Sequence, residues 1–212
     1  IENDTIPFID SLSFRWKGND VFVNKLSFSK NGRKLLIGAD KKKLWRHSFT
    51  STFFIYDIMN KEFFPVSSQN KKLRNAKFSP NGMYVSYVRS DNNIYIFNIK
   101  TKKEKQLTRT GSETLSNGHF GWLYEEELTG YDGYRWSPDS EYISFWEENQ
   151  EMVPEFFMLN ELNHYPTIKT IRYPKVGENN PSLRLGIVRL KGAGRKWIKG
   201  GAVQDGYLPW ME

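Results

Sequence analysis

The chain has 212 residues, with 31 lysines and arginines against 24 aspartates and glutamates, a net charge of +7 and no cysteine. The lack of cysteine excludes disulfide frameworks, cysteine-ligated zinc and cysteine nucleophiles. Phe, Trp and Tyr make up 16% of the residues, and because aromatic side chains favour half-buried pleated surfaces, this content predicts a folded, β-rich protein.

The positive charge is concentrated in short lysine clusters at 41–43, 71–72 and 100–105. Acidic residues such as Asp40 and Glu104 lie beside or within these clusters, so the lysines do not form one basic face. We interpret them as solvated loop residues and expect no nucleic-acid partner.

One sequence phrase recurs along the chain, at 26–37, 76–87 and 134–145. The same position of each copy holds an aromatic residue: Phe28, Phe78 and Trp136. The spacings between them are 50 residues (28 to 78) and 58 residues (78 to 136). Self-similarity on this scale is typical of propellers and solenoids, in which one unit cannot bury its apolar face alone.

Each copy of the phrase predicts a β-hairpin. An aromatic strand end is followed in the second and third copies by Ser-Pro-Asn-Gly or Ser-Pro-Asp-Ser, where Pro presets φ and Asn, Asp or Gly tolerates the left-handed conformation. Further strands are expected at 53–58, 94–99 and 104–108. Four short strands joined by tight turns make one propeller blade, and a β-sandwich would not explain the repeated phrase.

The segment before the first copy does not fit this rhythm. Phe-Arg-Trp at 14–16 resembles the start of a blade, yet too few residues separate Trp16 from Phe28 for a four-stranded unit at about 5 residues a strand. Either this blade is truncated or residues are absent from the sequence.

Two insertions break the blade rhythm, at 43–50 and at 117–128. The second contains three adjacent glutamates, Glu125, Glu126 and Glu127, after a Trp and a Tyr. One interpretation is a solvated acidic turn of a short helix. The other is a cation site, in which neighbouring carboxylates bind a substrate ammonium group through charge-assisted hydrogen bonds. The aromatic neighbours favour the second interpretation.

The chain contains no nucleophile elbow, no phosphate-binding loop, no zinc-protease motif and no calcium loop. Its histidines, His47, His119 and His164, share no local context, and we interpret them as loop or core residues. We therefore expect no catalytic residue and no metal ligand within this chain.

Five segments of the chain together form a specific pattern. They are Trp-Arg-His-Ser at 45–48, Gly-Trp-Leu-Tyr-Glu-Glu-Glu at 121–127, Tyr-Arg-Trp-Ser-Pro at 134–138, Arg-Tyr-Pro-Lys-Val-Gly at 172–177 and Asn-Pro at 180–181. In these segments and in their order, from about residue 13 to 190, the chain resembles the propeller domain of the dipeptidyl peptidase IV family, within the prolyl oligopeptidase serine peptidases.

The resemblance implies an all-β fold of four-stranded antiparallel blades. It identifies residues 1–212 as the N-terminal portion of a propeller that has eight blades in the family. The α/β-hydrolase domain, with its Ser-His-Asp triad, would lie outside this chain.

The resemblance further implies an exopeptidase that releases N-terminal Xaa-Pro or Xaa-Ala dipeptides from oligopeptides. Glu126 and Glu127 would bind the free amine of the substrate, and Arg46 the carbonyl of its second residue, while Glu125 would be a neighbour and not a ligand. No cofactor is implied. The intact protein is expected to be a homodimer with a periplasmic or otherwise extracytoplasmic location.

Alternatives remain at this point. A non-catalytic propeller could use the same acidic loop to bind a protein or peptide partner. Endopeptidase and acylaminoacyl peptidase relatives lack a paired-glutamate site, so the Glu126–Glu127 pair argues against them. Inactive relatives that have lost the nucleophile also fit these residues.

Overall fold

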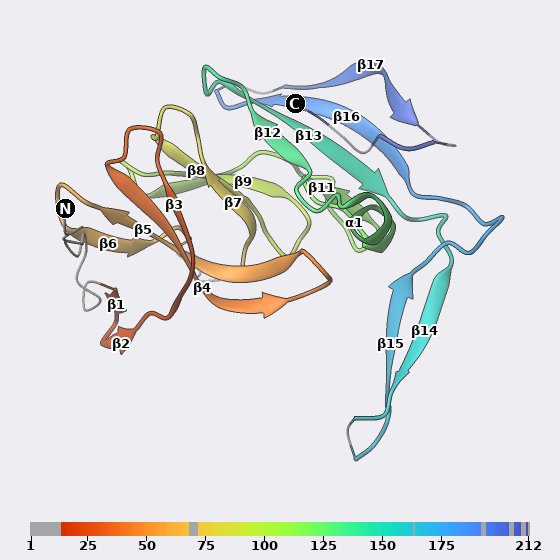
Figure 1. Cartoon of the computed structure of the whole chain (residues 1–212). Helices are drawn as coiled ribbons and strands as arrows, with labels where there is room; N and C mark the ends of the chain where they lie inside the picture. Colours follow the sequence, from red (N-terminus) through yellow and green to blue (C-terminus); the bar gives the residue numbers. More distant parts are fainter. Residues whose placement is uncertain are drawn as a thin grey trace, which may run out of the picture.

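A computed structural model describes residues 14–67, 72–162, 164–191, 194–203, 206–208 and 211 of the chain. Three antiparallel sheets, each built on four strands, follow one another in space as they do in sequence (Figure 1). This arrangement confirms the predicted all-β fold with four-stranded antiparallel blades. No helix within the described ranges is long and apolar enough to cross a membrane.

The first two sheets are simple meanders in which each strand pairs with the next one along the chain. The strands of the first sheet are β3 (Val23–Phe28), β4 (Lys34–Lys43), β5 (Phe49–Asp57) and β6 (Glu62–Pro65). Those of the second sheet are β7 (Arg74–Phe78), β8 (Tyr84–Val88), β9 (Ile94–Asn98) and β10 (Lys103–Gln106).

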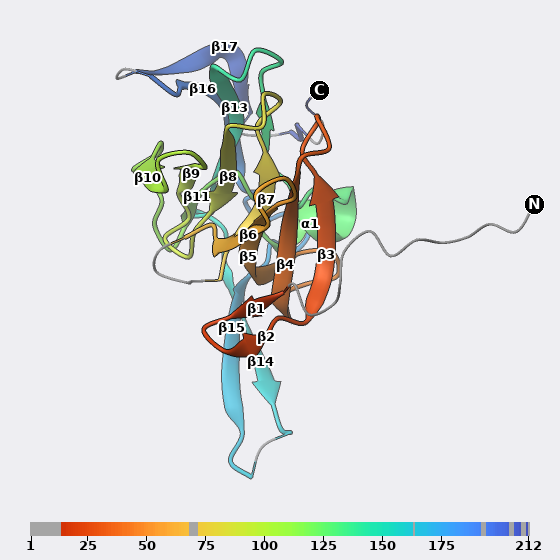
Figure 2. The same cartoon turned by 90° about the vertical axis from the view of Figure 1, so that its left-hand side faces the viewer.

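The third sheet is more elaborate. Its four main strands are β12 (Tyr134–Trp136), β13 (Tyr142–Asn149), β16 (Ser182–Arg189) and β17 (Arg195–Val203), and β11 (Leu115–Asn117) pairs with the far end of β13. Between β13 and β16 the chain leaves the sheet as a hairpin of β14 (Glu155–Asn160) and β15 (Thr167–Arg172). This hairpin, here called the arm, points away from the three sheets (Figure 2).

The repeated phrase forms the turn between the first two strands of each sheet. In the second copy, the hydroxyl of Ser79 donates to Asn81 Oδ1 (2.8 Å) and accepts the backbone N–H of Tyr84 (3.0 Å). Equivalent pairs of bonds form in the other two copies, at Ser29, Asn31 and Lys34 and at Ser137, Asp139 and Tyr142. The phrase therefore recurs because each turn is closed by the same side-chain contacts.

The left-handed residue of each turn is the fourth, with φ of +69° at Gly32, +67° at Gly82 and +64° at Ser140. The expectation was correct for the two glycines and wrong for the third copy, where Ser140 takes this conformation in place of Asp139. The Ser140 hydroxyl also accepts the backbone N–H of Asn81 (3.0 Å), so the extra cost of this conformation is offset by a bond to the neighbouring sheet.

Apolar side chains fill both spaces between the sheets. Successive residues of a strand point to opposite faces, so Tyr87 of β8 packs toward the first sheet whereas Val88 packs toward the third. On those neighbouring sheets the partners include Ile55 of β5 and Phe145 of β13, each fully buried. The second sheet is thus buried on both faces, as a propeller blade is.

The N-terminal part of the described chain covers the outer face of the first sheet. Here β1 (Arg15–Trp16) and β2 (Asn19–Asp20) form a small hairpin. Phe14 packs edge-on against Tyr56 at 5.7 Å between ring centroids, and Trp16 packs against Phe54 at 6.1 Å. The segment at 14–16 is therefore a two-stranded cover and not the start of a separate four-stranded blade.

Candidate functional site

The two insertions meet in space. Residues 44–48 of the first insertion form the loop between β4 and β5, and the second forms helix α1 (Trp122–Leu128). Arg46 donates from Nε to Glu126 Oε2 at 2.7 Å, and its backbone N–H donates to Glu126 Oε1 at 3.2 Å, across 80 residues of sequence. The structure thus places Arg46 and Glu126 in one site.

The first residues of α1 lie against β13. Gly121 is its N-cap, and the Gly121 N–H donates to Glu148 Oε2 at 2.6 Å, while Gln150 Nε2 donates to the same oxygen at 2.8 Å. A Cβ at Gly121 would lie only 1.9 Å from Gln150 Nε2, so a larger residue here would displace the Gln150 amide from Glu148. The helix ends at Thr129, which is left-handed with φ of 56°.

The three adjacent glutamates have different environments. Glu125 is fully buried, the side chain of Glu126 is 14% exposed, and Glu127 is exposed. Both oxygens of Glu126 contact Arg46, whereas Glu127 forms no hydrogen bond or ion pair with any other described residue. The short helix of the alternative interpretation exists, but its solvated carboxylates do not include Glu125.

Glu148 is the second buried carboxylate next to α1. It lies below 1% exposure, and burial raises its pKa from 4.5 to about 7, against the opposing effect of the hydrogen bonds from Gln150 and Gly121. The group that fixes the start of the helix therefore changes charge near neutral pH.

His119 is a core residue at the start of the same insertion. Its Nε2 lies 2.8 Å from Asn92 Oδ1 and its Nδ1 lies 3.2 Å from Arg74 Nη1. Because a guanidinium can only donate, Nδ1 is the acceptor and Nε2 carries the proton. Burial, with the charge of Arg74 as a further cause, lowers the pKa of His119 to about 3, so this histidine is neutral and structural.

The other two histidines have aromatic neighbours. His47 stacks on Tyr131 at 5.9 Å between ring centroids, and His164 contacts Tyr165 at 4.9 Å. In the ranges that the structure describes, no group of three or more His, Cys, Asp or Glu residues is placed to hold a metal ion.

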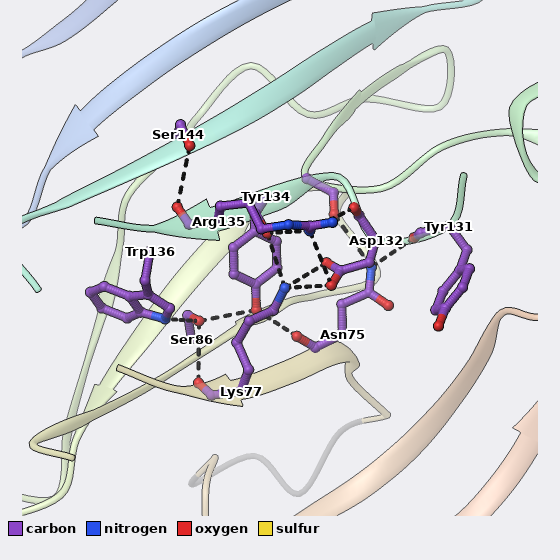
Figure 3. A network of polar contacts seen from close by, with 10 residues as sticks. Asn75, Lys77, Ser86, Tyr131, Asp132, Tyr134, Arg135, Trp136 and Ser144 are labelled. Carbon is purple, nitrogen blue, oxygen red and sulfur yellow. Dashed lines mark hydrogen bonds and ion pairs between the residues drawn. The ribbon is translucent and has the colours of Figure 1, made fainter. Parts of the chain in front are cut away.

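A polar network fixes the segment that follows α1 (Figure 3). Lys77 of β7 donates to both carboxylate oxygens of Asp132 at 2.6 Å and to the Tyr134 carbonyl at 3.0 Å, with its Nζ 3.9 Å from the Tyr134 ring centroid. Burial lowers the pKa of Lys77 to about 8, although Asp132 opposes this shift. Arg135 forms a second ion pair with Asp132, at 3.3 Å.

This network joins residues that no sequence motif connects. Asn75 Nδ2 donates to the Tyr131 carbonyl at 2.9 Å, and the Tyr134 hydroxyl donates to the Asn75 carbonyl at 2.5 Å. Lys77 and Tyr134 stand within repeat phrases, where they resemble ordinary strand residues, so no local signal distinguished them.

A cavity of about 340 Å³ opens between this network and the loop at 44–48. Its walls combine aromatic and charged side chains, and its lining residues include His47, Phe120, Tyr131, Asp132, Arg135 and Trp146. The arm also lies close by, since Lys169 Nζ of β15 is 4.2 Å from the Trp45 ring centroid and Tyr173, which directly follows β15, contacts Trp122 at 4.4 Å.

The site can bind both an oxygen acceptor and an ammonium group of a small ligand. The Arg46 side chain is 70% exposed, and of its side-chain nitrogens Nε alone is bonded within the described structure. Its terminal nitrogens can therefore donate to an incoming oxygen acceptor. Beside them, Glu126 and the exposed Glu127 present carboxylate oxygens that can accept from an ammonium group.

Comparisons with known proteins agree with this architecture. A family model described as the dipeptidyl peptidase IV N-terminal region matches residues 29–212. The chain is 33% identical over 192 residues to a probable dipeptidyl-aminopeptidase B of Talaromyces marneffei, and 32% identical over 189 residues to dipeptidyl aminopeptidase B of Saccharomyces cerevisiae.

These matches cover 84% and 86% of this chain but 21% and 23% of the two relatives, so the chain spans less than a quarter of their length. The crystal structure of Porphyromonas gingivalis dipeptidyl peptidase 4 is similar with a TM-score of 0.88 and 29% identity, over 95% of this chain and 29% of that one. A family model that covers most of the chain, with the matching fold, identifies it: the chain belongs to the family of the dipeptidyl peptidase IV N-terminal region.

Proposed function

We propose that this chain is the propeller part of a serine exopeptidase that releases N-terminal Xaa-Pro or Xaa-Ala dipeptides from oligopeptides. The observation that carries the proposal is the contact between Arg46 and Glu126, two residues from separate insertions. The nucleophile and its partners would come from a hydrolase domain outside these residues.

In this proposal Glu126 and Glu127 bind the free α-ammonium group of the substrate. An exopeptidase must measure position from the chain end, and an anchored amine places the second peptide bond about 7 Å away along an extended chain. Glu126 retains acceptor capacity beside Arg46, because each carboxylate oxygen has two lone pairs.

Arg46 has two roles in this arrangement. Its free terminal nitrogens would donate to the carbonyl oxygen of the second substrate residue. Its permanent charge also offsets the repulsion between the two neighbouring carboxylates before the substrate binds.

The direct test uses protein expressed from the complete gene and the chromogenic substrate Gly-Pro-p-nitroanilide. Glu126→Ala and Glu127→Ala should each lower kcat/KM by about 100-fold, because a charge pair with the substrate is worth about 3 kcal/mol. An N-acetylated substrate should be cleaved poorly by the unaltered protein, because it carries no ammonium group.

The control is Glu151→Gln, which removes one exposed carboxylate on the turn after β13. This variant should retain full activity. No activity in the intact protein would instead favour a non-catalytic propeller that binds a protein or peptide partner, and full activity of the Glu126 variant would contradict the assignment of the amine site.

We also propose that the intact protein is a homodimer and acts outside the cytoplasm, as the family resemblance implies. The exposed apolar residues of the arm support the proposed homodimer. Phe157, Leu159 and Ile168 are 61% to 69% exposed, and Leu159 stands directly opposite Ile168 in the hairpin. An exposed apolar face of this kind is typical of a protein contact surface.

A further inference from the structure

Glu125 has no place in the proposed contacts with substrate, yet it is the most completely buried of the three glutamates. We propose that Glu125 is a positioning residue, whose carboxylate holds the 44–48 loop against α1 and thereby sets Arg46 beside Glu126. This inference rests on the proposed function, because it concerns how the amine-binding site is assembled.

In the described part of the chain, both side-chain hydrogen bonds of Glu125 are with the loop that carries Arg46. Its Oε1 accepts the backbone N–H of His47 at 2.7 Å and that of Ser48 at 2.6 Å. These are the two residues that directly follow Arg46. Because a carboxylate roughly doubles the strength of such hydrogen bonds, Glu125 fixes the backbone immediately next to the Arg46 side chain.

The three consecutive N–H groups of the loop all point at α1. The Arg46 N–H donates to Glu126 Oε1 at 3.2 Å, and the next two donate to Glu125. The loop is closed on itself by a bond from the Leu44 N–H to the Ser48 carbonyl at 3.0 Å. Successive N–H groups in such a turn form a concave anion site, and here the anion is supplied by the protein itself.

The surrounding charges explain why a buried carboxylate is tolerated. Arg74 is half-buried, and desolvation lowers its pKa while the charge of Glu125 opposes that shift. Glu125 Oε2 is buried without a hydrogen-bond partner in the described structure, so the charge on Arg74 and the two loop N–H groups offset its desolvation.

Loss of Glu125 would therefore leave two N–H groups of the loop without an acceptor. Unpaired backbone groups move toward water, which would displace Arg46 from Glu126. The Glu126 carboxylate, which binds the substrate amine in the proposed function, would then lose the partner that aligns it. A displacement of about 1 Å is sufficient to cost about 100-fold in rate when a bound group must be aligned.

The test compares two substrates of protein expressed from the complete gene: Gly-Pro-p-nitroanilide and its analogue with a hydroxyl in place of the amine. The readout is the ratio of their kcat/KM values. Glu125→Ala should lower this ratio by about 100-fold. Glu125→Gln keeps the shape and one acceptor oxygen but not the charge, and it should lower the ratio by about 10-fold.

A purely structural role predicts a different result. Reduced folding would lower kcat for both substrates in proportion and leave their ratio unchanged. Because Glu125→Gln is isosteric, it keeps the test decisive even where Glu125→Ala does not fold: an unaltered ratio in Glu125→Gln overturns the inference.

Glu126→Gln and Glu151→Gln complete the experiment. If Glu126→Gln leaves the ratio unaltered, the proposed function fails. If it lowers the ratio and the Glu125 variants do not, the positioning role alone fails. The exposed Glu151→Gln variant should match the unaltered protein in both kcat/KM and the ratio.

Discussion

At the scale of the residue, identical side chains have different roles because their surroundings differ. Glu125, Glu126 and Glu127 are consecutive, but α1 turns them toward the interior, toward Arg46 and toward solvent in that order. A helix rotates by about 100° per residue, so three neighbours cannot share one environment. Residue type alone therefore could not assign their functions.

Glu148 provides a prediction about pH at this scale. Its pKa in the folded protein, about 7, lies above the ordinary value of 4.5, so the unfolded chain loses this proton at a lower pH than the folded protein does. The stability that comes from the protonated group is present below about pH 4.5 and is lost as the pH rises to about 7.

Glu148→Gln cannot ionise, and its amide oxygen can still accept the Gly121 N–H. The difference in melting temperature between this variant and the unaltered full-length protein should therefore increase from pH 5 to pH 8. The corresponding gain in the free energy of unfolding approaches about 3 kcal/mol at the higher pH. Scanning calorimetry at both pH values tests this, with Glu151→Gln as the control. A difference that does not change with pH would contradict the prediction.

At the scale of the element, the fold depends on turns that repeat and on insertions that do not. The repeated serine closes the first turn of every sheet, as in the bonds of Ser79 with Asn81 and Tyr84. By contrast, α1 and the 44–48 loop have no equivalents in the second sheet, and they form the candidate site. The regular elements thus supply a rigid frame, and the irregular ones supply the chemistry.

Ser79→Ala tests the role of the repeated turn. Ser79 is 1% exposed, so its loss leaves the Tyr84 N–H without an acceptor and should reduce the free energy of unfolding by about 1 to 3 kcal/mol. Thermal melting of the full-length protein measures the change. The exposed Ser90→Ala should have no effect, and an equal loss in both variants would rule out the explanation.

At the scale of the whole molecule, three sheets share two apolar interfaces and leave the arm free of them (Figure 1). The arm contacts the site along β15, through Lys169 and Trp45. Its other strand exposes Phe157 and Leu159, which project from the same face of β14 because they are two residues apart.

This arrangement predicts that the arm contributes to the proposed homodimer. A Phe157→Ser, Leu159→Ser double variant of the full-length protein should shift from dimer to monomer, because two large apolar side chains leave the contact surface. Light scattering after size-exclusion chromatography measures the mass. Met59→Ser, at a residue 73% exposed on the turn between β5 and β6, should remain dimeric, and a dimeric double variant would exclude the arm.

The sequence by itself determined the all-β class, the turns and the family, because turn chemistry is local and the phrase occurs three times. The family resemblance implied that Arg46 and Glu126 bind one substrate. The tertiary structure decided that they contact each other directly, and it alone brought together Glu125 with the loop and Lys77 with Asp132. Those contacts join different sheets, and burial there depends on packing between blades. No local pattern specifies such packing, so it could only be seen in the folded chain.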